Sequence, residues 1–98
     1  MINNKNKFMM RAIELSKISI DEGGGPFGCV IVKDKKIIAE GYNHVTKNND
    51  PTAHAEIVTI RKACNKLKTF ELSNVILFTS CEPCPMCLSA IYWAHINK

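Results

Sequence analysis

The sequence has no hydrophobic run long enough to cross a membrane, no internal repeat and no low-complexity tract. A membrane-spanning helix needs about 20 consecutive apolar residues. The N-terminal stretch MINNKNKFMMRAIELSK is charged and amphipathic, and it lacks the apolar centre of a secretory signal peptide. These absences argue against a membrane protein and a secreted protein. We therefore expect a cytoplasmic location and no membrane partner.

Arginine is also scarce. Of the 13 basic residues, only Arg11 and Arg61 are arginines, and the formal net charge is +4. Guanidinium groups make the bidentate phosphate contacts that nucleic-acid surfaces use, whereas the lysines here are scattered over several segments. The positive charge therefore does not predict a nucleic-acid interface, and we do not expect a nucleic-acid partner.

The rest of the composition is typical of one folded domain. Hydrophobic residues make up 46% and charged residues 22% of the 98 residues, which suits a globular chain with a modest core. We therefore predict a single domain over residues 1–98. Five cysteines is an odd number, and cytoplasmic thiols stay reduced, so a disulfide framework is the weaker interpretation.

The hydrophobic pattern predicts helices that alternate with strands. A helix is expected over about residues 4–22, followed by a hairpin with strands over residues 26–33 and 36–43. Asp50 and Pro51 predict the cap and the first residue of a second helix. Residues 74–80 are nearly all apolar, which is typical of an interior strand covered on both faces. A third helix begins within PCPMC, and the alternation predicts an α/β layered fold.

Three thiols stand close together in SCEPCPMCLSA, and two of them are spaced to bind a metal. Cys84 and Cys87 lie on one face of a helical first turn, where free N–H groups and the helix dipole stabilise thiolates. Zinc suits two thiolates and one imidazole. His95 lies too far along the helix to join them, and His44 is expected to be a solvated loop residue. His54 is therefore the predicted third ligand.

His54 belongs to the tripeptide His54-Ala55-Glu56. Residues two apart on a helix converge only at its N-terminal tip, where side chains lean back past the helix start. Three protein ligands leave a fourth zinc position open for water, and a carboxylate that does not bind the metal can accept the proton of that water. Glu56 fits this catalytic role. The pattern H-x-E followed by P-C-x-x-C is also typical of zinc deaminases.

The third thiol of the run, Cys81, leaves an alternative open. A closed structural Cys3His site would join Cys81 to the three ligands above, but it would leave Glu56 without a role. We favour the open site, with Cys81 as a small buried residue of the turn. We interpret Glu82 as a charge that stabilises the helix N-terminus.

Four segments together resemble the guanine deaminase branch of the cytidine-deaminase-like zinc deaminases: GGGPFGCVIVKD, IIAEGYN, NDPTAHAEIVTIRKAC and LFTSCEPCPMCLSAIYWA. The resemblance implies a three-layer α/β/α fold around a central mixed sheet, and the hydrolysis of guanine to xanthine and ammonia. His54, Cys84 and Cys87 match the zinc ligands of that branch, and Glu56 matches its proton shuttle.

The resemblance also implies how a purine base would be bound. Asn43 matches the amide that reads the base edge, and the backbone N–H of Ala55 would hold a base oxygen. Phe27 and Trp93 match aromatic positions near the pocket. A homodimer is the assembly that the resemblance implies.

These 98 residues lack the last strands and helices of that branch, which supply another acidic pocket residue and a cap over the base. Two alternatives to a guanine-specific enzyme therefore stay open. One is a tRNA adenosine deaminase or another base deaminase, of which the tRNA enzyme would need a coherent basic groove leading to the zinc. The other is a zinc-binding module with only a structural or dimerisation role.

Overall fold

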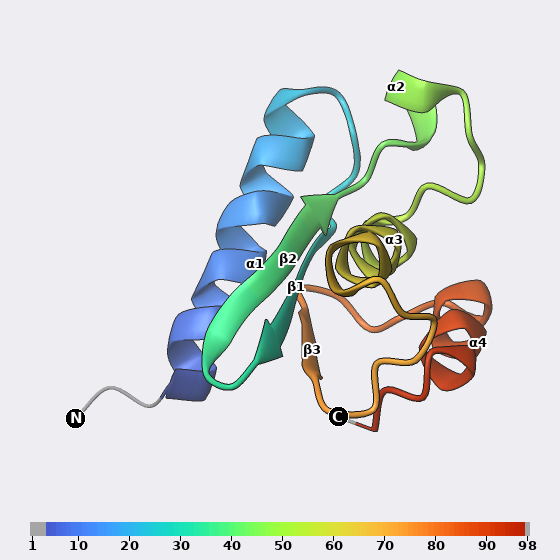
Figure 1. The fold of residues 1–98 in the computed structure, drawn as a ribbon. Helices are drawn as coiled ribbons and strands as arrows, with labels where there is room; N and C mark the ends of the chain where they lie inside the picture. Colours follow the sequence, from blue (N-terminus) through green and yellow to red (C-terminus); the bar gives the residue numbers. More distant parts are fainter. Residues whose placement is uncertain (1–3, 98) are drawn as a thin grey trace.

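The computed structural model describes residues 4–97 as a three-stranded sheet between helical layers (Figure 1). Helix α1 (Asn4–Asp21) covers one face of the sheet, and helices α3 (Ala55–Leu67) and α4 (Pro85–Trp93) lie on the other side. The predicted α/β/α layering is therefore confirmed. No helix of the described residues is long and apolar enough to span a membrane.

The strands are β1 (Gly28–Lys33), β2 (Lys36–Tyr42) and β3 (Ile76–Thr79), in the order β2-β1-β3. Both pairings are antiparallel, so the parallel pair expected of a mixed sheet is not among the described strands. The predicted hairpin is confirmed. Asp34 and Lys35 form its two-residue turn with φ of 53° and 64°, the left-handed conformation that matches the twist of the flanking strands.

The prediction of a doubly covered strand was wrong in its location. Strand β1 is the central one, and its residues from Gly28 to Val32 are all buried. Strand β3 lies at the sheet edge, and only Phe78 of its residues is buried. An apolar run predicts that the side chains of a strand are buried. It does not predict whether the strand pairs with neighbours on both sides, which decides whether it is central or at the edge.

Alternation along β1 builds two cores, one on each face of the sheet. Val30 and Val32 face α1, and Ile31 faces the side of α3 and α4. The core under α1 holds Phe8, Ala12 and Leu15, which recur at helical spacing, together with Phe78. The second core is lined by residues of β1, β2, α3 and the segments that flank β3 and α4: Ile31, Ala39, Ala63, Leu72, Val75, Ala94 and Ile96.

The second predicted helix starts four residues later than expected, at Ala55 rather than Pro51. Asp50 does not cap this helix, because its Oδ1 accepts hydrogen bonds from the backbone N–H (2.9 Å) and the hydroxyl (2.7 Å) of Thr52 and so closes a separate turn. A short helix α2 (Val45–Asn48) lies between the hairpin and this turn. The later start makes His54 the N-cap residue of α3.

Candidate metal centre

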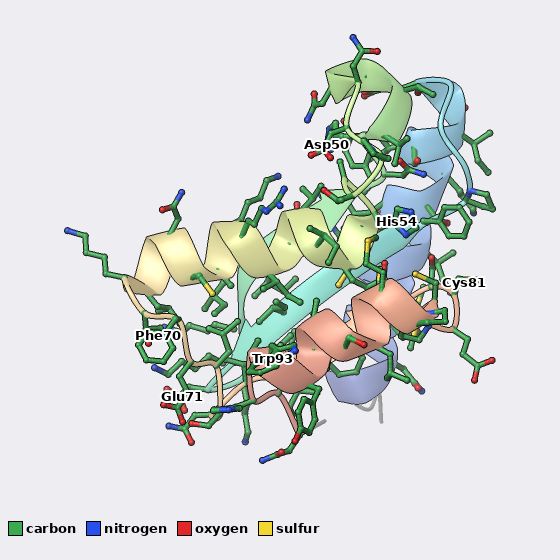
Figure 2. All side chains as sticks on the ribbon, turned by 90° about the vertical axis from the view of Figure 1, so that its right-hand side faces the viewer. Asp50, His54, Phe70, Glu71, Cys81 and Trp93 are labelled. Atoms are coloured by element: carbon green, nitrogen blue, oxygen red, sulfur yellow. The ribbon has the colours of Figure 1, made fainter. Side chains whose placement is uncertain are left out.

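The candidate site forms where the N-terminal ends of α3 and α4 meet. His54 is the N-cap residue of α3, Cys84 is the N-cap residue of α4, and Cys87 lies in the first turn of α4. The Nδ1 atom of His54 is 3.6 Å from Sγ of Cys84 and 3.5 Å from Sγ of Cys87. All three donor atoms lie within 4.8 Å of one another. Figure 2 shows His54 at the start of α3, facing the start of α4.

The spacing of these donors fits a tetrahedral zinc ion. Zinc bonds of about 2.3 Å to sulfur and about 2.0–2.1 Å to nitrogen, at tetrahedral angles, place sulfur and nitrogen about 3.5–3.6 Å apart. The observed separations of 3.5 and 3.6 Å agree with this geometry. The donor set of two thiols and one imidazole also suits zinc.

Cys81 is not part of the group of metal donors that the described residues form. Its side chain is exposed, contrary to the expectation of a buried turn residue, and its carbonyl accepts a hydrogen bond of 3.0 Å from the Thr79 hydroxyl. The closed Cys3His alternative therefore finds no support in this geometry. Three donors leave one tetrahedral position for another ligand.

The two cysteines of the site differ in their tendency to ionise. The backbone N–H of Cys87 donates to Sγ of Cys84 at 3.5 Å, and this is the first of the hydrogen bonds that lower the pKa of Cys84. Burial raises the pKa of Cys87 to about 12, and the charge of Glu56 adds to the effect. Metal binding must therefore displace a proton from Cys87, whereas the lowered pKa of Cys84 makes its thiolate easier to form.

Glu56 is a buried carboxylate, with only 6% of its surface exposed. It lies in the first turn of α3, two residues after His54, and both line one pocket of about 100 Å³. The predicted convergence of His54 and Glu56 at a helix tip is therefore observed. A buried carboxylate without a metal bond is suited to accept and return protons.

Two of the predicted substrate-binding residues line the same pocket. Asn43 follows β2 and Phe27 precedes β1, so both lie at the open end of the hairpin, where the Asn43 N–H donates to the Phe27 carbonyl at 3.3 Å. Ala55 is fully buried between His54 and Glu56 and does not itself line the pocket. Its backbone N–H is the first of α3 and has no partner within the helix, because the first four N–H groups of a helix have none.

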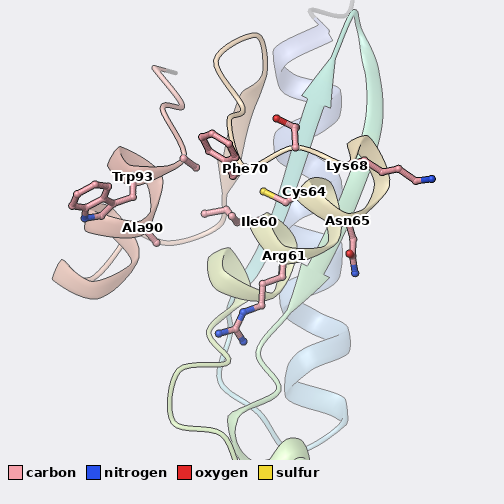
Figure 3. A pocket seen from close by; sticks show the side chains of 10 residues that line it. Ile60, Arg61, Cys64, Asn65, Lys68, Phe70, Ala90 and Trp93 are labelled. Atoms are coloured by element: carbon pink, nitrogen blue, oxygen red, sulfur yellow. The ribbon is translucent and has the colours of Figure 1, made fainter.

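The structure does not bring Trp93 to the pocket that His54 and Glu56 line. Trp93 is the last residue of α4, 76% exposed, and it lines a different pocket of about 770 Å³ with Ile60 and Phe70 (Figure 3). Six residues separate it from Cys87, which corresponds to about 9 Å along a helix axis. The helix therefore carries the indole away from the metal centre.

Sequence reasoning also misplaced two neighbours of the site. Glu82 lines the pocket together with Glu56, although we expected it only to stabilise the helix N-terminus. Its position two residues before the metal donor Cys84 could have indicated that it lies near the site. His44 is not a solvated loop residue. Its ring packs on Tyr42 at a centroid distance of 4.6 Å, and its Nδ1 is buried without a hydrogen-bond partner among the described residues.

Comparison with known proteins identifies the family. A family model described as the cytidine and deoxycytidylate deaminase zinc-binding region matches residues 2–98. This chain belongs to that family. The match agrees with the His-Cys-Cys group that the structure brings together, and zinc is the cofactor of this deaminase domain.

Relatives within the family include two kinds of deaminase. Guanine deaminase of Bacillus subtilis is 61% identical over 93 residues, which are 94% of this chain and 60% of that protein. Its X-ray structure superimposes with a TM-score of 0.92, covering 98% of this chain and 61% of that one, at 58% identity. The tRNA-specific adenosine deaminase of Aquifex aeolicus is 38% identical and covers 96% of this chain and 62% of that protein. The chain thus spans less than two thirds of the length of these relatives.

Proposed function

We propose that this domain catalyses the zinc-dependent hydrolytic deamination of guanine to xanthine and ammonia. The observation that carries the proposal is the buried carboxylate of Glu56 in one pocket with His54 and Cys84, two donors of the three-donor metal group. His54, Cys84 and Cys87 would hold the zinc. When bound, zinc supplies a Lewis acid that lowers the pKa of water.

Glu56 is the proposed proton carrier. Its carboxylate accepts a proton from the attacking water and delivers it to a ring nitrogen of the base. It then takes the remaining proton from the hydroxyl group added to the ring carbon and gives it to the amino group, which leaves as ammonia. The buried position suits this task, because a carboxylate shielded from bulk water exchanges protons with the substrate rather than with solvent. Water adds one oxygen to the ring carbon and ammonia leaves from it, so the reaction is balanced.

Asn43 is proposed to orient the base through its amide NH2 group. Its Oδ1 already accepts a hydrogen bond of 2.7 Å from the backbone N–H of Val45, so the NH2 group is the part left to contact a ligand. An acceptor on the base edge, such as a carbonyl oxygen or a ring nitrogen, would satisfy it. Phe27, which is 37% exposed at the pocket, offers an apolar ring against the flat base.

Guanine is favoured over a tRNA adenosine by the relatives and by the charge pattern. The guanine deaminase relative is 61% identical, against 38% for the tRNA-specific relative over a similar share of the chain. The pocket residues also include Glu56 and Glu82 and no lysine or arginine, so they do not form the basic path that an RNA substrate would need. The homodimer and the cytoplasmic location expected from the sequence stay predictions.

The test is ammonia release from guanine, adenine, cytosine and cytidine by the zinc-loaded protein, with zinc quantified in the same sample. The proposal predicts turnover of guanine above the other three. Preferential release of ammonia from another base would contradict the proposed substrate, and zinc binding without turnover of any base would favour the structural module.

A further inference from the structure

A carboxylate outside the pocket organises the segment that presents Asn43. Glu22 directly follows α1, and both of its oxygens accept hydrogen bonds from the Tyr42 hydroxyl, at 3.0 and 2.9 Å. The ammonium of Lys47 in α2 donates to the same carboxylate at 2.9 Å. Glu22 therefore binds the residue before Asn43 and a residue four positions after it. Figure 1 shows the end of α1 and α2 at the same end of the molecule.

Contacts within the segment place Asn43 between these two anchors. The ring of His44 packs on the ring of Tyr42, so the anchored tyrosine supports the residue on the other side of Asn43. The backbone N–H of His44 donates to the carbonyl of Ala53 at 2.9 Å, which joins this segment to the start of α3. Asn43 closes its own turn by accepting from the N–H of Val45.

We propose that Glu22 is a positioning residue that fixes Asn43 with its amide NH2 turned to the purine base. This inference rests on the proposed function, in which Asn43 reads the base edge. Glu22 does not line the pocket, and among the described residues its carboxylate has no other hydrogen-bond or ion-pair partner than Tyr42 and Lys47. Without the Glu22 carboxylate, Tyr42 before the turn and Lys47 after it lose their common partner at the end of α1. The turn that contains Asn43 is then less firmly fixed. A mobile Asn43 side chain would lose conformational freedom when it binds the base, and this entropic cost weakens binding. A side chain that is already fixed avoids that cost.

The test is equilibrium binding of 8-azaguanine, a guanine analogue, to zinc-loaded protein by calorimetry. All variants carry Glu56→Gln, so that the ligand stays intact. Glu22→Ala is expected to weaken binding roughly three- to tenfold, the range of hydrogen bonds to an exposed charged group. Asp21→Ala is the matched control. It removes the same charge one residue away, from a side chain without a hydrogen bond or ion pair among the described residues, and is expected to bind as its parent does.

A double-mutant cycle separates positioning from a general structural effect. In an Asn43→Ala background, Glu22→Ala should cause no further loss of affinity, because the amide through which it acts is gone. An equal loss in both backgrounds, or no loss in either, would overturn the proposal. Zinc content and melting temperature of each variant establish that the fold persists.

The proposed reaction is tested apart from this cycle, by guanine turnover of the unmutated protein. If guanine is not turned over but Glu22→Ala weakens 8-azaguanine binding only when Asn43 is present, the proposed function is overturned and the role of Glu22 stands. If guanine is turned over but the effect of Glu22→Ala does not depend on Asn43, the proposed function stands and the role of Glu22 is overturned. Failure of the zinc-loaded parent to bind 8-azaguanine would overturn the role of Glu22 together with that of Asn43.

Discussion

At the scale of single residues, the site depends on two helix caps that are also metal donors. His54 and Cys84 each occupy an N-cap position, where the side chain points past the helix end rather than along its flank. Cys84 uses its sulfur to accept the N–H of Cys87, so the same interaction caps the helix and favours the thiolate. The three thiols near α4 therefore have different roles, although the sequence sets them at equal intervals.

Serine substitutions of these thiols should separate the roles. Cys84→Ser and Cys87→Ser are expected to lose bound zinc, because each removes one of three donors, whereas Cys81→Ser is the matched control and should retain a full equivalent. Zinc measured by mass spectrometry against protein concentration checks this. Loss of zinc in Cys81→Ser to the same extent would show a closed four-ligand site instead.

The metal group could be predicted from the sequence because the spacing of Cys84 and Cys87 places both thiols on one helical turn, and because His54-Ala55-Glu56 completes a pattern typical of zinc deaminases. The same pattern identified Glu56 as the carboxylate beside the metal group. The direction of Trp93 could not be predicted, because it depends on where α4 lies against its neighbours. The start of α3 was misjudged because Asp50 and Pro51 suit a turn as well as they suit a helix start. The hydrogen bonds from Thr52 to Asp50 show that the turn forms.

At the scale of elements, α1 is tied to the sheet by an ion pair as well as by its apolar face. Nε and one terminal nitrogen of Arg11 donate to the two carboxylate oxygens of Glu40 in β2, at 2.9 and 2.6 Å. The side chains are about one third exposed, so solvent screens much of their attraction. The hydrogen bond from Arg11 is the main cause that lowers the pKa of Glu40.

This ion pair predicts a pH-dependent part of the stability. A folded-state pKa below the unfolded value of about 4.3 adds stability above that value, and the contribution is lost as the pH falls through the folded pKa. Glu40→Gln should lower the free energy of unfolding at pH 7 by about 0.5–1 kcal/mol. The difference from the unmutated protein should shrink as the pH is lowered towards 3. Urea unfolding at both pH values measures it, and an equal difference at both would rule out the charge as the cause.

At the scale of the whole molecule, the metal group joins parts of the chain that are distant in sequence. His54 and the two cysteines are 30 and 33 residues apart, and they come from helices on the same side of the sheet. A ligand that binds only the folded chain stabilises it in proportion to the logarithm of its concentration. A metal held by both helices should therefore stabilise the domain as a unit.

Zinc is accordingly expected to raise the melting temperature, and a chelator to lower it. A free zinc concentration of 1,000 times the dissociation constant raises the free energy of unfolding by about 4 kcal/mol. Calorimetric scans of the metal-free protein with added zinc measure the shift, and Cys84→Ser serves as the control that should not respond. A melting temperature that does not depend on zinc would mean that the three donors do not bind it in the folded state.

The most direct test of the account compares Glu56→Gln with the unmutated protein, measuring bound zinc and ammonia release from guanine in the same samples. The substitution keeps the size of the side chain and removes its ability to accept a proton. The account predicts one zinc per chain in both proteins and a loss of turnover of at least a hundredfold in the variant, since general acid–base catalysis typically contributes that much. Turnover that persists in zinc-loaded Glu56→Gln would contradict the assignment of Glu56 as the proton carrier.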